Sequence, residues 1–366
     1  MLQPWFDRIR AEQSGFNRAL KAHHTGSITG RFSAVPDDLP RRASTRALSI
    51  HFWTPHPWPS VAKHVEMVLP YLRAEATALG LRWRITSGPE LPQQPVDWLL
   101  CLKAVPPRRR AATERTVLLL NDGTDRFWSR LRRFDYVFVI SSPVLASLVG
   151  SAHPRVWFVE ETEPLDIIAQ GERALVRLPP SKRPPRLLWH GRPESLDGLF
   201  PLRATLETFA QGGGVELTVV TNQAAATEQW GALRVRFVDW SAEALAELAA
   251  EARLGIVPAR PPLAESYLKS AGRVRSLFAL GCPAIGDSRS PDVTAFSDAC
   301  GLPSATVGAQ WLAALRQLWH EPMRLDETAR RGHALVREQY SVLRTARQWL
   351  WFFCTAENEP PPASRA

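Results

Sequence analysis

The sequence predicts an α/β protein with two parallel sheets, one in each half of the chain, each covered by helices on both faces. Short, nearly continuous apolar runs alternate with segments of helical periodicity, which is typical of buried parallel strands. A Pro-rich basic stretch at residues 178–185 interrupts this alternation, which then restarts. Because 366 residues are enough for two domains of ordinary size, we expect two Rossmann-like domains facing each other across a cleft.

In the first half, an apolar strand at residues 47–53 is followed by helical periodicity over residues 61–79. Further strands are predicted at residues 81–86, 96–102, 116–120, 136–140 and 155–159. We assign residues 46–177 to an N-terminal Rossmann-like domain. Residues 1–45 are interpreted as an N-terminal extension outside the core, and residues 178–185 as a linker.

The second half, residues 186–340, is predicted to form the C-terminal Rossmann-like domain. Its expected strands lie at residues 186–190, 215–221, 233–238, 254–258 and 283–286, with helices at residues 201–210 and 242–252. Residues 341–356 are expected to form a helix that crosses back. Its aromatic cluster at residues 349–353 is predicted to pack across the domain junction, with a membrane-dipping face as the alternative. Residues 357–366 are expected to be a disordered tail.

Composition favours a cytoplasmic protein with anionic partners. The net charge is +9 and the pI is near 9.9, which suits nucleotides, nucleic acid or an acidic membrane surface. No apolar run approaches a membrane span, and the four cysteines are too scattered for a metal site or a disulfide framework. The arginine runs at residues 108–110 and 130–133 lack interleaved aromatics, so we expect no nucleic acid partner. Solvated faces, or peripheral contact with the inner face of an anionic membrane, suit them better.

A basic segment at residues 269–276 predicts an anion site. On a helix, Lys269, Arg273 and Ser276 fall on one face, and Ser270 is a plausible N-cap. A helix N-terminus beside fixed cations suits a diphosphate. The alternative is an ordinary solvated amphipathic helix.

Several segments of the second half, in order, resemble the C-terminal domain of GT-B glycosyltransferases. These are residues 187–192 (LLWHGR), 235–240 (VRFVDW), 254–258 (LGIVP), 269–273 (KSAGR) and 279–285 (ALGCPAI). The last two resemble the retaining group-1, or family-4-like, nucleotide-sugar enzymes. The resemblance implies a hexosyltransferase of bacterial polysaccharide or glycoconjugate biosynthesis. It would take a nucleotide sugar as donor and a glycan or lipid-linked acceptor, which the N-terminal domain would bind.

The resemblance also implies roles for individual residues. Arg192, Lys269 and Arg273 match the basic positions that neutralise the donor diphosphate, with Ser270 beside them. Ser276 stands where a ribose-binding Glu is usual. The other donor-site neighbours are His190, Gly191 and Glu265, the last lying near the place of the first Glu of the family's E-x7-E pair. Since Ser276 replaces that Glu, a non-catalytic nucleotide-sugar-binding relative that acts as a partner or regulator is the alternative.

The candidate catalytic residues lie in the first half. His56, in the loop after the first strand, is a candidate general base, although a Pro-flanked surface histidine is the alternative. Asp122 follows another strand and is a candidate base or acceptor-hydroxyl partner, or else a turn that caps a helix. The chain holds no Asp-x-Asp pair. We therefore predict a metal-independent reaction without a cofactor. The acidic run at residues 160–163 is interpreted as a solvated turn.

Overall fold

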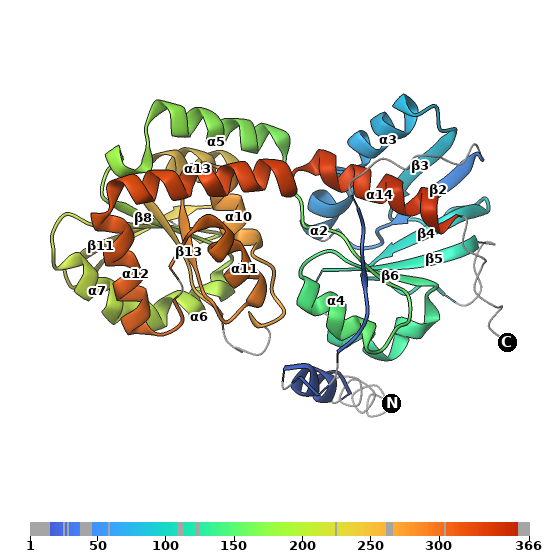
Figure 1. Ribbon diagram of the computed structural model, residues 1–366, viewed down its shortest axis with the longest axis horizontal. Coiled ribbons are helices and arrows are strands. Elements are labelled where there is room, and N and C mark those ends of the chain that lie inside the picture. Colours follow the sequence, from blue (N-terminus) through green and yellow to red (C-terminus); the bar gives the residue numbers. More distant parts are fainter. Residues whose placement is uncertain are drawn as a thin grey trace. The chain divides into compact units, whose positions relative to one another are not determined.

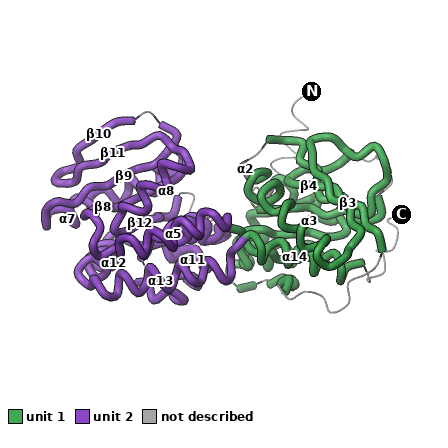
Figure 2. Tube along the Cα trace, turned by 90° about the horizontal axis from the view of Figure 1, so that it is seen from above, with its two compact units in different colours: residues 1–162, 342–366 green, residues 163–341 purple. Residues whose placement is uncertain are grey.

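The computed structural model (Figure 1) describes residues 15–24, 26–27, 29–36, 46–57, 59–107, 113–121, 124–223, 225–260, 266–303 and 305–357. The chain forms two compact units, one made of Met1–Thr162 and Val342–Ala366 and the other of Glu163–Ser341 (Figure 2). Each unit contains one sheet with helices packed on it. The prediction of two Rossmann-like domains is confirmed.

The sheet of the first unit has seven strands in the order β1-β7-β6-β5-β4-β2-β3 among the described residues, and every pairing in it is parallel. The strands are β1 (Ser33–Ala34), β2 (Leu48–Trp53), β3 (Trp83–Gly88), β4 (Val96–Leu102), β5 (Thr113–Leu120), β6 (Tyr136–Val139) and β7 (Val156–Phe158). All predicted strands of this half are present. The short edge strand β1 was not predicted, because two residues are too few to show a period.

The helical segments that follow β2 in the first unit are α2 (Pro59–Val61), η1 (Ala62–Glu66), α3 (Leu69–Ala78), η2 (Thr124–Arg133), α4 (Pro143–Gly150) and α14 (Val342–Ala356). The single helix expected over residues 61–79 is divided, because η1 is a π-helical turn and α3 begins with Pro70 in its first turn. Ser142 caps α4 by accepting a hydrogen bond from the Leu145 N–H.

The C-terminal helix α14 lies in the core of the first unit. Trp349, Phe352 and Phe353 are each at most 1% exposed. The ring of Trp349 stacks on Phe138 at 4.6 Å between centroids, and Phe352 contacts Phe138 edge-on at 4.3 Å. This packing corrects both expectations for the aromatic cluster, because these side chains are buried inside one unit and face neither a junction nor a membrane. Within the described residues, no helix is both long and apolar enough to cross a membrane.

The described part of the N-terminal extension also belongs to the first unit, which corrects its interpretation as lying outside the core. Residues 15–24 are helical, and Phe16 packs edge-on against Trp128 at 5.5 Å between ring centroids. Val35, after β1, is 3% exposed in the main apolar cluster, and its carbonyl accepts a hydrogen bond from Gln348 Nε2 at 3.0 Å. Of the expected tail at residues 357–366, Glu357 is described and its N–H donates to the Phe353 carbonyl at 3.2 Å, whereas residues 358–366 lie outside the described residues.

The sheet of the second unit has six strands in the order β10-β11-β9-β8-β12-β13 within the described residues. The strands are β8 (Arg186–His190), β9 (Glu216–Thr221), β10 (Ala226–Trp230), β11 (Leu233–Asp239), β12 (Leu254–Val257) and β13 (Ala284–Gly286). All pairings are parallel except that of the edge strand β10, which forms an antiparallel hairpin with β11. The five predicted strands are present, and β10 is additional.

The main helices of the second unit are α5 (Leu165–Arg177), α7 (Arg203–Ala210), α8 (Ala242–Glu251), α10 (Gly272–Ala279), α11 (Pro291–Cys300), α12 (Gly308–His320) and α13 (Pro322–Gln339). Shorter turns are η3 (Pro180–Lys182), η4 (Pro193–Ser195), α6 (Leu196–Leu199) and η5 (Phe200–Leu202). Helices α5 and α10 approach so closely at Gly171 that an added Cβ would lie 2.0 Å from the Ala279 carbonyl oxygen. A side chain at this position would force the two helices apart.

The boundary between the units differs from the expected linker. The chain passes from one unit to the other between Thr162 and Glu163, before α5, and returns before Val342. The Pro-rich stretch lies inside the second unit, where Arg183 is 3% exposed. Its guanidinium donates to the carbonyls of Leu178, Ala249 and Ala252. These contacts fix the stretch, so its composition reflects a packed turn.

Candidate functional site

The carboxyl edge of the second unit's sheet gathers most of the predicted donor-site residues. In parallel sheets this edge is the usual place of ligands. His190 ends β8 and Gly191 follows it, and Pro258 follows β12, which pairs with β8. Helix α10, labelled in Figure 1, packs against β12 and β13 and carries Arg273 in its first turn.

The Arg273 guanidinium is held across the ends of two neighbouring strands. Its Nη1 donates to the His190 carbonyl at 3.4 Å and its Nη2 to the Pro258 carbonyl at 3.2 Å. Its Cζ also lies 6.0 Å from the centroid of the Trp189 ring. Burial lowers the pKa of the Arg273 guanidinium to about 10, which leaves it cationic at neutral pH. The edge therefore carries one oriented positive charge.

Gly191 keeps the space beside this guanidinium clear. A Cβ at Gly191 would lie 2.9 Å from Cη2 of Trp189 and 3.1 Å from Nη1 of Arg273. Its N–H donates to the Val220 carbonyl, which joins this turn to β9. His190 is 8% exposed, and its Nε2 lies 3.3 Å from the Arg273 carbonyl oxygen. The backbone of α10 therefore also contacts the end of β8.

The other predicted cations, Arg192 and Lys269, are exposed. Arg192 lies two residues beyond the end of β8, and Lys269 lies just before α10 with its carbonyl accepting from Ser290 Oγ at 2.6 Å. Both thus belong to segments that adjoin Arg273. Lys269 precedes the helix, so the predicted helical face shared with Arg273 and Ser276 is not formed.

The start of α10 differs from the predicted anion site. The helix begins at Gly272 with Ala271 as its N-cap, whereas Ser270 accepts from the Gly272 N–H at 3.2 Å. The Ala271 N–H donates to Asp292 Oδ2 at 2.5 Å. A carboxylate of the protein therefore already binds at this helix N-terminus. Any phosphate at this edge would depend mainly on the cationic side chains.

Ser276, in the place of the expected Glu, is hydrogen-bonded to a carboxylate from another segment. Its Oγ donates to Glu163 Oε1 at 2.8 Å, and Glu163 is only 5% exposed. The Glu163 N–H donates to the Tyr340 carbonyl at 2.7 Å. The interpretation of residues 160–163 as a solvated turn is wrong for Glu163. Sequence spacing could not reveal this contact, because 113 residues separate the two partners.

Two more side chains at this edge were not predicted. Trp240, directly after β11, is 45% exposed, an unusual exposure for the largest side chain. Thr221, the last residue of β9, is fully buried, and its Oγ1 has no hydrogen-bond partner within the described part of the chain. Because β9 lies between β8 and β11, Thr221 lies between Arg273 and Trp240 along the edge.

The structure describes only one of the two predicted catalytic residues of the first unit. His56 is exposed in the loop after β2. Asp122, like Glu265 of the second unit, lies outside the described residues. Its neighbour Asn121 contacts His64, with 3.1 Å between Nδ2 and Nε2. His64 is 3% exposed and lies in the π-turn η1, a type of distortion often found at functional sites.

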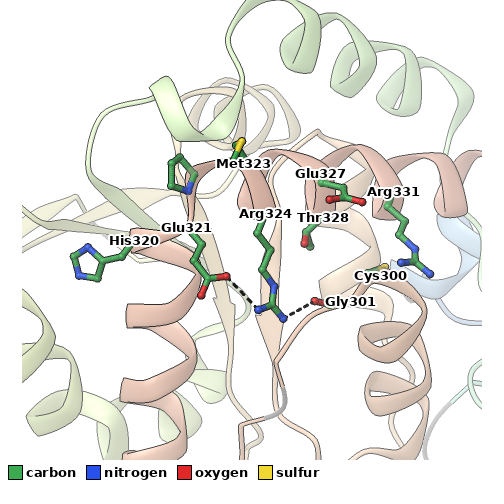
Figure 3. Close-up of a pocket in the computed structure, with 10 residues that line it drawn as sticks. Cys300, Gly301, His320, Glu321, Met323, Arg324, Glu327, Thr328 and Arg331 are labelled. Carbon is green, nitrogen blue, oxygen red and sulfur yellow. Dashed lines mark hydrogen bonds and ion pairs between the residues drawn. The ribbon is translucent and has the colours of Figure 1, made fainter.

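A separate pocket of about 720 Å³ lies at the end of α11 and the corner between α12 and α13 (Figure 3). It contains none of the predicted site residues. Arg324 spans its wall, donating to Glu321 Oε2 at 3.2 Å and to the Gly301 carbonyl at 3.4 Å. Across the described residues, no group of three His, Cys, Asp or Glu side chains is arranged to hold a metal ion.

Comparison with solved structures identifies the fold. HepE from Anabaena, in complex with UDP and glucose, matches with a TM-score of 0.56 and 10% identity over 84% of this chain and 100% of HepE. The fold is that of the GT-B glycosyltransferases. WaaG, a glycosyltransferase involved in lipopolysaccharide biosynthesis, matches with a TM-score of 0.52 and 12% identity over 83% of this chain and 99% of WaaG.

Sucrose-phosphate synthase from Thermosynechococcus elongatus matches this GT-B chain with a TM-score of 0.52 and 14% identity, over 83% of this chain and 82% of the synthase. No family model and no curated protein matches at the level of sequence. The resemblance seen in the second half of the sequence is thus confirmed for the fold.

Proposed function

We propose that the protein is a glycosyltransferase that moves a sugar from a nucleoside-diphosphate sugar to an acceptor hydroxyl. The observation that carries this proposal is the oriented Arg273 guanidinium at the carboxyl edge of a GT-B fold. A diphosphate leaving group gains negative charge as the glycosidic bond breaks. A cation already fixed by backbone carbonyls stabilises that charge with little reorganisation.

The arrangement of the edge supports a full nucleotide, with the diphosphate at Arg273 and the base further along. Exposed Arg192 and Lys269 add positive charge beside it. From β8 to β11 the sheet advances by two strand spacings, or about 10 Å. Trp240, directly after β11, is thus placed to stack on the base.

In this chain the carboxylate for the ribose would come from a residue outside the helix, whereas in the family it comes from a Glu on the helix. Glu163, held by Ser276 at 2.8 Å, brings a carboxylate to the helix position that the family fills with Glu. Ser276 then positions Glu163 and does not leave the ribose without a partner. A carboxylate can accept several hydrogen bonds at once, and the Glu163 carboxylate is proposed as the group that meets the ribose diol.

The acceptor and the reaction details are also part of the proposal. His56 is proposed as the general base and Asp122 as a second acceptor-side residue. Catalysis would be metal-independent and cofactor-free, because cations at the edge take the role of a metal, and the family resemblance implies a retaining hexosyl transfer. WaaG and its role in lipopolysaccharide biosynthesis support a glycan or lipid-linked acceptor, made in the cytoplasm of a bacterium.

A non-catalytic nucleotide-sugar-binding relative is the second candidate. It is favoured by Ser276 in place of Glu and by Asp292, whose carboxylate binds the Ala271 N–H at the start of α10. The two candidates differ in turnover. The test incubates the protein with UDP-, GDP-, ADP- and dTDP-sugars, with and without acceptors, and measures release of the nucleoside diphosphate. Release that Arg273→Ala abolishes supports the enzyme, whereas binding without any release supports the alternative.

A further inference from the structure

The pocket at the end of α11 is large enough for a small molecule and lies apart from Arg273. Its volume of about 720 Å³ falls in the usual range of ligand pockets. Helix α11 begins beside the start of α10, where Asp292 accepts from the Ala271 N–H, and it ends in the pocket wall at Cys300. Its ten residues span about 15 Å. The pocket and the start of α10 therefore lie at opposite ends of one helix.

Helix α13 supplies the polar wall of the pocket. Arg324, Thr328 and Arg331 recur at i, i+4 and i+7, so they share one face of this helix. Arg324 Nη2 donates to the Gly301 carbonyl at 3.4 Å, and Arg331 Nη1 lies 3.9 Å from the place that a Cβ on Gly301 would take. Figure 3 shows both side chains extending from α13 toward the end of α11. Two guanidinium groups thus meet at one backbone position.

The protein balances only part of the charge on this wall. Arg324 forms an ion pair with Glu321 at 3.2 Å, whereas Arg331 and Glu327 line the same pocket as exposed side chains. A Glu four residues before an Arg on a helix usually gives an attractive pair. Here neither side chain forms a hydrogen bond or an ion pair with any group in the described part of the chain (Figure 3). One cation and one carboxylate therefore remain for a ligand.

The Thr328 hydroxyl is also available to a ligand. Helical Thr77 and Thr208 each donate to the carbonyl four residues earlier, which satisfies the hydroxyl inside the helix. Thr328 lines the pocket, and among the described residues its hydroxyl has no hydrogen-bond partner. Cys300 is the other small polar side chain of the lining. Burial raises the pKa of its thiol to about 12, so it stays uncharged at neutral pH.

We propose that this pocket binds a small zwitterion with one carboxylate and one ammonium group, the chemistry of a free α-amino acid. The Arg331 guanidinium binds the ligand carboxylate through two parallel hydrogen bonds, and the Thr328 hydroxyl donates to the same group. The Glu327 carboxylate accepts from the ammonium group. Two arginines, two glutamates and one histidine line the pocket. A phosphate dianion would meet both glutamates, whereas a zwitterion preserves the balance of charge. This inference goes beyond the proposed function and does not depend on it.

The test measures the thermal shift of the full chain with each standard L-amino acid and with inorganic phosphate. Isothermal titration calorimetry then gives the affinity for the amino acid with the largest shift. Its deaminated acid and its decarboxylated amine, which each lack one of the two charges, are titrated as well. The pocket variants are Arg331→Gln, Glu327→Gln and Thr328→Val. The matched controls, Arg330→Gln and Glu338→Gln, change exposed positions of the same helix outside the pocket. Thermal melts without ligand confirm that all variants fold.

We expect at least one amino acid to bind saturably and more tightly than its deaminated acid or its amine. Its affinity should fall at least about tenfold in Arg331→Gln and in Glu327→Gln, since each removes a charged hydrogen bond, and about fivefold in Thr328→Val. The controls should bind as the unaltered protein does. The proposal is overturned if no amino acid binds, or if the controls lose as much affinity as the pocket variants. Binding of inorganic phosphate alone, undiminished by Glu327→Gln, would assign the pocket to simple anions instead.

Discussion

Replacing Arg273 by Ala should weaken the binding of nucleoside diphosphates strongly while leaving the protein folded. The side chain is held by the carbonyls of His190 and Pro258 at 3.4 and 3.2 Å, so little conformational entropy is lost when a phosphate binds. Hydrogen bonds that involve a charged group contribute about 1.5–3 kcal/mol. The dissociation constant should therefore rise about 10- to 150-fold.

The assay is isothermal titration calorimetry with the nucleoside diphosphate that binds the unaltered protein best. Lys269→Ala serves as a graded comparison. Because Lys269 is exposed, its charge is screened by water and the loss should stay below about fivefold. Arg316→Ala, on an exposed position of α12, controls for net charge and should not change affinity.

Two further measurements test the charge and the shape of the Arg273 side chain. Arg273→Lys keeps the charge but not the planar fork that spans two carbonyls, so its affinity should fall between those of the Ala variant and the unaltered protein. Since the Arg273 pKa is about 10, affinity should also stay constant from about pH 7 to 9. Unchanged affinity in Arg273→Ala, with an unchanged unfolding free energy, would refute the placement of the diphosphate.

Three other predictions follow from the structure. Trp240→Ala should lower nucleoside-diphosphate affinity at least about fivefold, the lower end for base stacking, without changing pyrophosphate affinity, and an equal loss for both ligands would contradict stacking. Gly171→Ala should destabilise the protein by at least about 1–3 kcal/mol in urea unfolding because its Cβ meets the Ala279 carbonyl, whereas Gly212→Ala, with only an ordinary contact at 3.9 Å, should not. Burial lowers the pKa of His333, so the unfolded state binds more protons below about pH 6.5 and stability falls as the pH drops toward 5. His333→Gln should make that fall smaller, and an equal fall would exclude His333 as its source.

The strands could be predicted because buried parallel strands have a strong local pattern. β4 and β5 are almost entirely buried, and their apolar runs show this without any knowledge of the fold. The Pro-rich stretch misled because composition alone cannot show that Arg183 donates to the carbonyls of Ala249 and Ala252, which come from another segment. The aromatic cluster of α14 misled for a similar reason, since its partners Phe138 and Trp98 come from strands far away in the sequence.

Site residues could be predicted where a single segment of the sequence shows both the residue type and its place next to a strand end. Arg273 and Gly191 lie next to strand ends, and their segments could be matched to a family pattern. The capping of α10 by Asp292 and the pairing of Ser276 with Glu163 join segments 21 and 113 residues apart. Such contacts depend on tertiary packing, which no local period encodes. The exposure of Trp240 was hidden for the same reason.

The most direct test of the proposed reaction is nucleoside diphosphate release from a panel of nucleotide sugars in the presence of glycan and lipid-linked acceptors, followed by mass spectrometry of the acceptor. We predict that one donor is consumed with equal release of its diphosphate and a gain of one sugar mass on the acceptor, and that Arg273→Ala abolishes both. Saturable nucleoside diphosphate binding without release from any donor would contradict the transferase and leave a nucleotide-sugar-binding protein.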